Sequence, residues 1–213
     1  MSKQLQKISK IGLVPLVVLE DAACAKPLGE ALAAGGIPIA EVTFRTDACL
    51  ATIHAMKEIP SLIVGAGTVH TAEQAAAAVA AGATYIVTPA YNPSVIEYCI
   101  AHDVDVIPGT VTPGEIEGAR AYGIRLCKFF PAAAYGGTTT LKALAGPFAD
   151  VQFLPTGGVN NENMLDYLTL PNVAAVGGSF MTPDKLVAAH DWAGIAAVCR
   201  TAVQKVRDAL PDR

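Results

Sequence analysis

Apolar runs that are typical of buried β-strands recur at nearly even intervals along this chain. The ends of successive runs are 20 to 26 residues apart, which leaves room for a loop, a helix of about three turns and the next strand. Strands separated by helices in this way pair in parallel and are covered by the helices. The runs end near Val18, Thr43, Gly67, Pro89, Gly109, Pro131, Gly157 and Gly178.

Eight strand–helix units in one chain predict an α/β fold, the closed (β/α)8 TIM barrel. A doubly wound open sheet is the alternative, but the first strand, residues 13–18, is not followed by a Gly-x-Gly-x-x-Gly turn. A chain of 213 residues that is 52% hydrophobic can bury one sizeable core, and no linker interrupts it. We expect a single domain over residues 1–213, with a short N-terminal helix before Ile11 and a closing helix over residues 191–210.

Charge, hydropathy and cysteine usage argue against several classes of partner. The net charge is -4, and no cluster of lysine and arginine offers a surface to nucleic acid. Apolar runs are too short to span a membrane, and the N-terminus lacks the apolar region of a signal peptide, so we expect no membrane partner. The five cysteines are scattered and form no Cys-x-x-Cys pair, which predicts reduced thiols in a cytoplasmic protein.

Lys128 lies inside a short apolar run, residues 126–131, which predicts a buried strand. A buried ammonium is costly unless it is paired or becomes neutral, and a neutral amine can form a Schiff base with a carbonyl substrate. The alternative is an outward-facing lysine whose stem packs on a helix while its charged end reaches water. Both interpretations remain open from this run alone.

The second strand places two more ionisable side chains on the same face as Thr43. Alternation along residues 41–45 puts Glu41 and Arg45 on one face, with Arg45 about 13 Å nearer the carboxyl end. In a barrel the carboxyl ends of the strands carry the chemistry. We therefore expect Glu41 to lie deep in the interior, where Lys128 is its available partner, and Arg45 to lie at the rim. The alternatives are a structural carboxylate for Glu41 and an exposed loop arginine.

Paired glycines follow the seventh and eighth predicted strands, at Gly157–Gly158 and Gly177–Gly178. In barrels of this kind, bare backbone N–H groups and a helix N-terminus after these two strands commonly bind phosphate. The pattern favours a phosphorylated substrate, although glycines that serve only tight turns would look the same.

The histidines do not form a metal site. His54, His102 and His190 fall in or beside predicted helices, and only His70 follows a strand end. No histidine pair has zinc spacing, no aspartate cluster suits magnesium, and no serine–histidine triad is evident. We therefore expect no metal and no cofactor, and covalent catalysis through a lysine remains.

Five motifs, in order along essentially the whole chain, resemble those of the 2-keto-3-deoxy-6-phosphogluconate (KDPG) aldolases. These enzymes are class I pyruvate aldolases and overlap with 4-hydroxy-2-oxoglutarate (KHG) aldolase. The resemblance implies a homotrimer of (β/α)8 barrels in the Entner–Doudoroff route, which forms pyruvate and glyceraldehyde 3-phosphate. The motifs are Glu41-Val42-Thr43-x-Arg45-Thr46, Gly65-Ala66-Gly67-Thr68-Val69, Lys128-Phe129-Phe130-Pro131-Ala132, Pro155-Thr156-Gly157-Gly158 and Gly177-Gly178-Ser179.

The resemblance also implies roles for individual residues. Lys128 would form the Schiff base, and Glu41 would move protons. Pyruvate would be held at its carboxylate by Arg45 and Thr68 and enclosed by Phe130 and Pro89. The hydroxyls and phosphate of the substrate would face Thr156, Gly157, Gly158, Gly178 and Ser179.

Two loops depart from the family pattern on the aldehyde side of the predicted pocket. Residues 132–137 are Ala-Ala-Ala-Tyr-Gly-Gly where many relatives have glutamate and asparagine before the glycines, and residues 88–90 are Thr-Pro-Ala rather than Ser-Pro-Gly. The galactonate epimer and 4-hydroxy-2-oxoglutarate remain alternative substrates. Thr156 favours the gluconate form because relatives that prefer the galactonate epimer tend to be apolar there.

Two other classes of protein fit the residues less well. A metal-free phosphosugar isomerase or epimerase on the same barrel would use Lys128 only for its charge. A catalytically silent phosphate-binding barrel would gain no clear stability by burying Glu41 and Lys128 in place of apolar residues.

Overall fold

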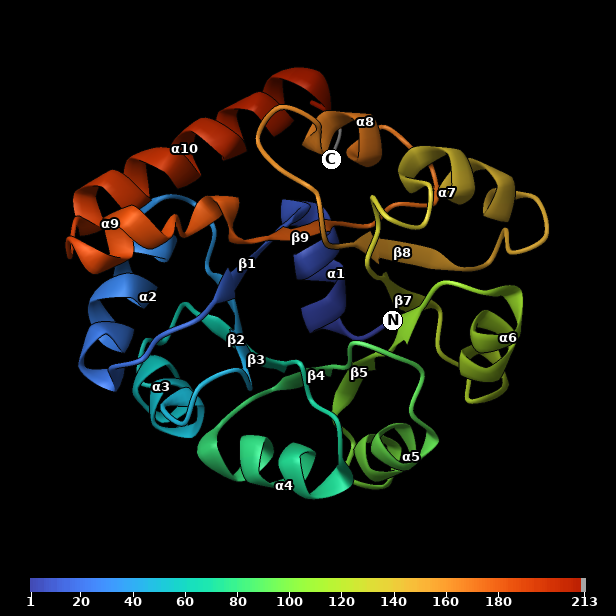
Figure 1. The fold of residues 1–213 in the computed structure, drawn as a ribbon, viewed down its shortest axis with the longest axis horizontal. Helices are drawn as coiled ribbons and strands as arrows, with labels where there is room; N and C mark the ends of the chain where they lie inside the picture. The colour runs from blue at the N-terminus through green and yellow to red at the C-terminus, as the bar shows by residue number, and fades with distance from the viewer. Residues whose placement is uncertain (212–213) are drawn as a thin grey trace.

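The computed structural model describes residues 1–211, so the last two residues of the predicted domain, 212 and 213, lie outside it. Strands and helices alternate along the chain, and Figure 1 shows the strands around the centre with the helices outside them. The N-terminal helix, α1 Lys3–Ile11, is the exception and is seen at the centre of the ring of strands. The strands are β1 Leu13–Val17, β2 Ile39–Thr43, β3 Ile63–Gly67, β4 Tyr85–Val87, β5 Asp105–Ile107, β6 Gly109–Thr110, β7 Leu126–Phe129, β8 Gln152–Pro155 and β9 Val176–Gly178. The helices are α1 Lys3–Ile11, α2 Ala25–Ala34, α3 Cys49–Met56, α4 Ala72–Ala81, α5 Pro93–Ala101, α6 Pro113–Ala121, α7 Gly137–Ala145, α8 Met164–Leu168, α9 Asp184–Ala188 and α10 Trp192–Ala209, with 3₁₀ turns η1 Ala22–Cys24 and η2 Ser179–Met181.

The strands pair in parallel, which confirms the predicted α/β fold with a parallel sheet. Their hydrogen bonds form two curled sheets rather than one continuous ladder: the first has the order β5-β4-β3-β2-β1-β9 and the second β6-β7-β8. The predicted fifth strand is divided at Pro108, whose nitrogen has no hydrogen to donate. Its first half pairs with β4 and its second half with β7. An isolated bridge between Thr156 and Gly177 joins the end of β8 to β9.

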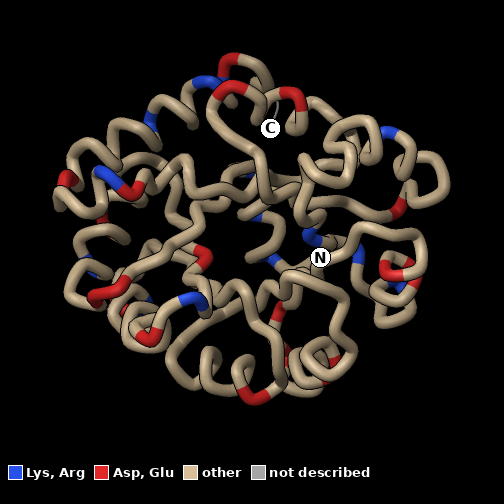
Figure 2. The backbone as a smooth tube through the Cα atoms, in the orientation of Figure 1, with Lys and Arg blue, Asp and Glu red and all other residues tan. Residues whose placement is uncertain are grey.

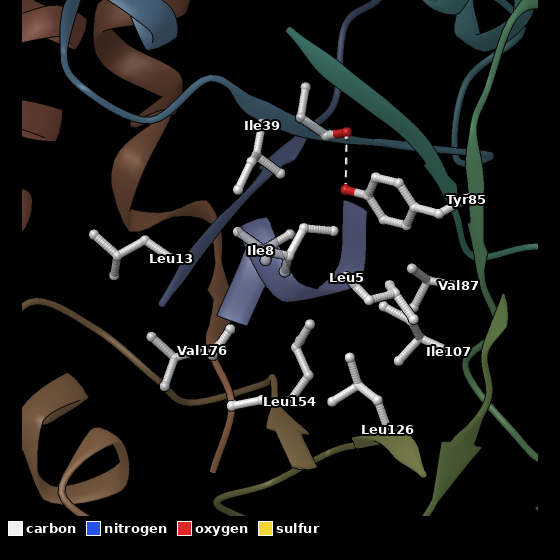
Figure 3. Close-up of a cluster of buried hydrophobic side chains, with 14 of the residues drawn as sticks. Leu5, Ile8, Leu13, Ile39, Tyr85, Val87, Ile107, Leu126, Leu154 and Val176 are labelled. Carbon is white, nitrogen blue, oxygen red and sulfur yellow. Dashed lines mark hydrogen bonds between the residues drawn. The ribbon is translucent and has the colours of Figure 1, made fainter. Parts of the chain in front are cut away.

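The predicted N-terminal helix is present as α1, and it packs against the amino-terminal ends of the strands. Ser2 caps its start by accepting a hydrogen bond from the Leu5 amide, and Gly12 ends it with a φ of 77°, a conformation that favours glycine. Leu5 and Ile8 are buried in an apolar layer, called the floor below, between α1 and the amino-terminal ends of the strands (Figure 3). The floor also contains inward-facing strand residues, among them Leu13, Ile39, Tyr85, Val87, Ile107, Leu126, Leu154 and Val176.

Side-chain caps fix the starts of α6 and α4. At α6, Thr112 and Glu115 form a complete capping box, and proline occupies the first turn. At α4, Thr71 accepts a hydrogen bond from the Gln74 amide, but the Gln74 side chain bonds to the His70 amide instead of the Thr71 amide. The capping box at Thr71 is therefore only half formed.

Charged residues lie mainly along the outer helices and loops, where Figure 2 shows the two signs interspersed. The predicted closing helix is α10, whose start is capped by Asp191. Within residues 1–211, no helix combines the length and apolar character that a bilayer span requires.

The cysteines give a direct test of this packing. Cys99, Cys127 and Cys199 are fully buried, and burial raises the pKa of each thiol to about 12. Because the thiolate is the reactive form, these three should resist iodoacetamide at about pH 8 in the native protein and react after unfolding. The half-buried Cys24 should react in the native state. Peptide mass mapping checks this, and alkylation of Cys127 before unfolding would contradict the described core.

Candidate active site

Lys128 and Glu41 form a buried ion pair in the interior. Lys128 lies on β7 in the second sheet and Glu41 on β2 in the first, 87 residues apart in sequence. The Lys128 Nζ atom donates a hydrogen bond to Glu41 Oε1 over 3.2 Å, and the two side chains are 4% and 0% exposed. The structure thus forms the pair that the sequence predicts and excludes an outward-facing Lys128.

The glycine at position 67 makes room for the Glu41 carboxylate. Gly67 pairs with Thr43 on the neighbouring strand, two residues beyond Glu41. A Cβ at position 67 would overlap Glu41 Oε1 and lie 2.6 Å from its Cγ. From the sequence, Gly67 was only one glycine of a strand end that ordinary packing could explain; the contact makes it a requirement for the position of Glu41.

One oxygen of Glu41 remains available for chemistry. Oε1 accepts the hydrogen bond from Lys128, whereas the buried Oε2 has no hydrogen-bond partner in the described structure. An unpaired buried carboxylate oxygen is costly and normally has a function or a water partner. Here it gives the site an acceptor for a proton or a water molecule beside the amine.

Phe130 lies beside this pair and shares a cleft with Pro89. The Lys128 Nζ atom is 5.3 Å from the centre of the Phe130 ring. Phe130 and Pro89 line a common cleft of about 220 Å³, together with the exposed Tyr135 and with Glu115. The sequence did not single out Glu115 for this cleft, because its capping role accounts for the residue fully. The cleft therefore joins the two predicted pocket walls to the loop after β7 that departs from the family pattern.

The loops after β7 and β8 are held together beside Phe130. The Ala133 amide donates to the carbonyl of Gly157, and the hypothetical Cβ of Gly157 would lie 3.3 Å from the Phe130 ring. Gly157 and Gly158 have φ angles of 92° and 79°, which side-chain-bearing residues rarely adopt. A side chain at Gly158 would also overlap the Ala133 methyl group. Gly157 and Gly158 are thus required by their left-handed φ angles and by the close packing of the two loops.

Thr156 and the glycines of β9 lie next to this loop. Thr156 bridges to Gly177, where a Cβ would lie 2.5 Å from the Thr156 hydroxyl. The Thr156 Oγ1 atom is buried and has no hydrogen-bond partner in the described structure. Gly178 has an extended backbone, and Ser179 is exposed at the start of η2. The turn directly after β9 is therefore the three-residue 3₁₀ turn η2.

Arg45 and Thr68 lie just beyond strand ends, and within residues 1–211 neither forms a hydrogen bond or ion pair with Lys128 or Glu41. β2 ends at Thr43, so Arg45 lies in a turn and its side-chain direction does not follow from strand alternation. The position of Arg45 at the rim, above Glu41, stays a prediction. Arg45 is exposed, and no acidic side chain of residues 1–211 forms an ion pair with it. Thr68 follows Gly67 with a φ of 59°, an unusual conformation for a β-branched residue.

Parallel strands that bring a buried lysine and carboxylate together define an α/β enzyme in which an amine can attack a carbonyl group. The chain belongs to the KDPG and KHG aldolase family, whose model matches residues 5–198. A 2-dehydro-3-deoxy-phosphogluconate aldolase of Treponema pallidum is 43% identical over 202 residues, which cover 94% of this chain and 96% of that protein. The family inferred from the five motifs is confirmed.

Two solved structures share this fold closely. KDPG aldolase of Legionella pneumophila, with pyruvate captured at low pH as a covalent carbinolamine intermediate, has a TM-score of 0.90 and 37% identity, covering 94% of this chain and 98% of that chain. The 2-keto-3-deoxy-6-phosphogluconate aldolase of Zymomonas mobilis, solved with 3-phosphoglycerate, has a TM-score of 0.89 and 35% identity, covering 94% and 95%.

The buried pair predicts an asymmetric response to substitution. Lys128→Met leaves the Glu41 carboxylate buried without a cation and should lower the free energy of unfolding by about 3–5 kcal/mol. Adding Glu41→Met removes that charge, so the double variant should recover most of the loss or exceed the original stability. Urea unfolding followed by circular dichroism measures this. A double variant less stable than Lys128→Met alone would contradict the assigned interaction.

Proposed function

We propose that this chain is a class I aldolase, a lyase that cleaves 2-keto-3-deoxy-6-phosphogluconate to pyruvate and glyceraldehyde 3-phosphate. The observation that carries the proposal is the buried contact between Lys128 Nζ and Glu41 Oε1. Relatives named for this aldolase activity, and the neighbour solved with a covalent pyruvate carbinolamine, support the same chemistry.

The pair supplies a nucleophile and a proton acceptor in contact. Transfer of a proton from Lys128 to Glu41 leaves a neutral amine that attacks C2 of the ketoacid, and loss of water gives an iminium ion. Glu41 gives that proton to the departing water and so becomes a carboxylate again. It then takes the proton of the C4 hydroxyl while the iminium draws electrons from the C3–C4 bond, so the aldehyde departs and an enamine remains. Glu41 then returns a proton to C3, and hydrolysis releases pyruvate and Lys128.

The roles of the surrounding residues follow the resemblance of their motifs to the family. Arg45 and Thr68 bind the pyruvate carboxylate at the rim, and Phe130 and Pro89 enclose the ketoacid. Hydroxyls and phosphate are bound by Thr156, Gly157, Gly158, Gly178 and Ser179. Support comes from the left-handed glycines and from the unpartnered Thr156 hydroxyl.

The wider organisation follows the family. The two curled sheets act as one closed (β/α)8 barrel, joined at Pro108 and at the bridge between Thr156 and Gly177. The chain functions in the cytoplasm as a single-domain protomer of a homotrimer, with a phosphorylated ketoacid as its partner and neither a metal nor a cofactor in the reaction.

Borohydride trapping tests the nucleophile. Pyruvate with borohydride should inactivate the protein and add a reduced pyruvate group to Lys128, because an iminium is reduced to a stable secondary amine. Peptide mass mapping locates the adduct, and prior treatment with EDTA should not prevent it. Lys128→Met should form no adduct, whereas Lys142→Met, on the exposed side of α7, should label normally. An unlabelled Lys128 in active protein would favour the isomerase or epimerase alternative.

Substrate choice is tested at Thr156. Its buried, unpartnered hydroxyl can bond a substrate hydroxyl, and mispairing of such a group costs about 1–3 kcal/mol. We expect the gluconate-type phosphorylated ketoacid to be preferred over its galactonate epimer and over 4-hydroxy-2-oxoglutarate. Thr156→Val should reduce this preference by roughly tenfold, a change of about 1.4 kcal/mol. A coupled assay of kcat/KM measures it, and equal values for both epimers in the unmodified protein would refute the assignment.

A further inference from the structure

Gly65 lies between Glu41 and Tyr85 in one row across three strands. On β3, Gly65 is paired with Glu41 of β2 on one side and with Tyr85 of β4 on the other. Gly65 has no side chain, so a side chain from either neighbouring strand can occupy the space over it. Tyr85 and Glu41 are the two inward-facing candidates, and both are fully buried.

The Tyr85 ring fills this space. A Cβ at position 65 would overlap the Cζ, Cε1 and Cε2 atoms of Tyr85, so the ring lies directly over Gly65. Its hydroxyl donates a hydrogen bond of 3.1 Å to the carbonyl oxygen of Ala40, the residue before Glu41 (Figure 3). The ring therefore spans β3 and is anchored to the backbone of β2 at Glu41.

Glu41 consequently places its carboxylate over the next glycine on the face. Although its backbone is paired with Gly65, its carboxylate occupies the space over Gly67, about 6.6 Å further toward the carboxyl end of β3. The negative charge lies close enough to Tyr85 to act on it: burial first, and the Glu41 charge second, raise the pKa of the Tyr85 hydroxyl well above its ordinary value.

We propose that Tyr85 is a positioning residue: its ring occupies the space over Gly65 and so holds the Glu41 carboxylate forward, over Gly67 and against Lys128. The proposal rests on the aldolase function proposed above. In that function Glu41 gives a proton to C3 of the enamine. In the reverse direction it takes a proton from C3 of the pyruvate iminium, so the C–H bond breaks, the enamine forms and the carboxylate is protonated. A displacement of about 1 Å can slow such a proton transfer by roughly a hundredfold.

Two readouts separate positioning from simple packing. Adduct formation at Lys128 with pyruvate and borohydride reports the imine. Deuterium exchange at C3 of pyruvate in D2O, followed by NMR, reports the proton transfer that follows it. Tyr85→Met keeps apolar volume but loses the planar ring, and it should lower exchange relative to imine formation by about tenfold or more. Tyr85→Phe keeps the ring and should hold that ratio within about threefold of the unmodified protein, because it loses one hydrogen bond.

Gly65→Ala tests the same contact by changing the glycine instead of the tyrosine. The added methyl group must displace the Tyr85 ring, so this variant should also lower exchange more than imine formation. It decides the question if Tyr85→Met does not fold. Phe148→Met is the matched control, because Phe148 is a buried aromatic residue after α7 and away from the ion pair. It should lose stability while leaving the ratio unchanged.

An unchanged ratio in both Tyr85→Met and Gly65→Ala, or an equal fall in Phe148→Met, would overturn the positioning role. Failure of the proposed function gives a different result: the unmodified protein would then form no adduct and exchange no deuterium.

Discussion

The buried ion pair between Glu41 and Lys128 is the interaction on which the rest of the site depends. It connects the two hydrogen-bonded sheets, because each sheet contributes one partner. Removing two charges from water is expensive, and apolar residues of similar size would often be as stable. The pair is therefore explained by its chemical role and not by a contribution to stability. Among residues 1–211, one oxygen of Glu41 has no hydrogen-bond partner, which suits a group that must exchange protons during a reaction.

Glycines on the inner faces of the strands make this arrangement possible. Each missing side chain is replaced by a neighbour: Tyr85 lies over Gly65, the Glu41 carboxylate over Gly67 and the Thr156 hydroxyl beside Gly177. A close-packed interior leaves little freedom for such groups to move. The glycines thus do more than permit turns, since they determine how far each polar side chain extends toward the carboxyl ends of the strands.

Much of this could be predicted from the sequence, because strand–helix spacing and a lysine in an apolar run are local signals. The division of the fifth strand at Pro108 was not predicted, since it depends on which neighbour each half meets. The side-chain direction of Arg45 could not be predicted from alternation, because β2 ends two residues before it. Tyr85 was not recognised because its contact with Gly65 depends on the register between strands, which no local pattern contains.

The central claim is that the Lys128 amine leaves its ion pair to bond covalently with a ketoacid. The most direct test is a crystal structure of the protein soaked in pyruvate. The account predicts continuous density between Lys128 Nζ and C2 of pyruvate, with Glu41 beside C3. Pyruvate held without a covalent bond, with the 3.2 Å contact between Lys128 and Glu41 intact, would contradict it.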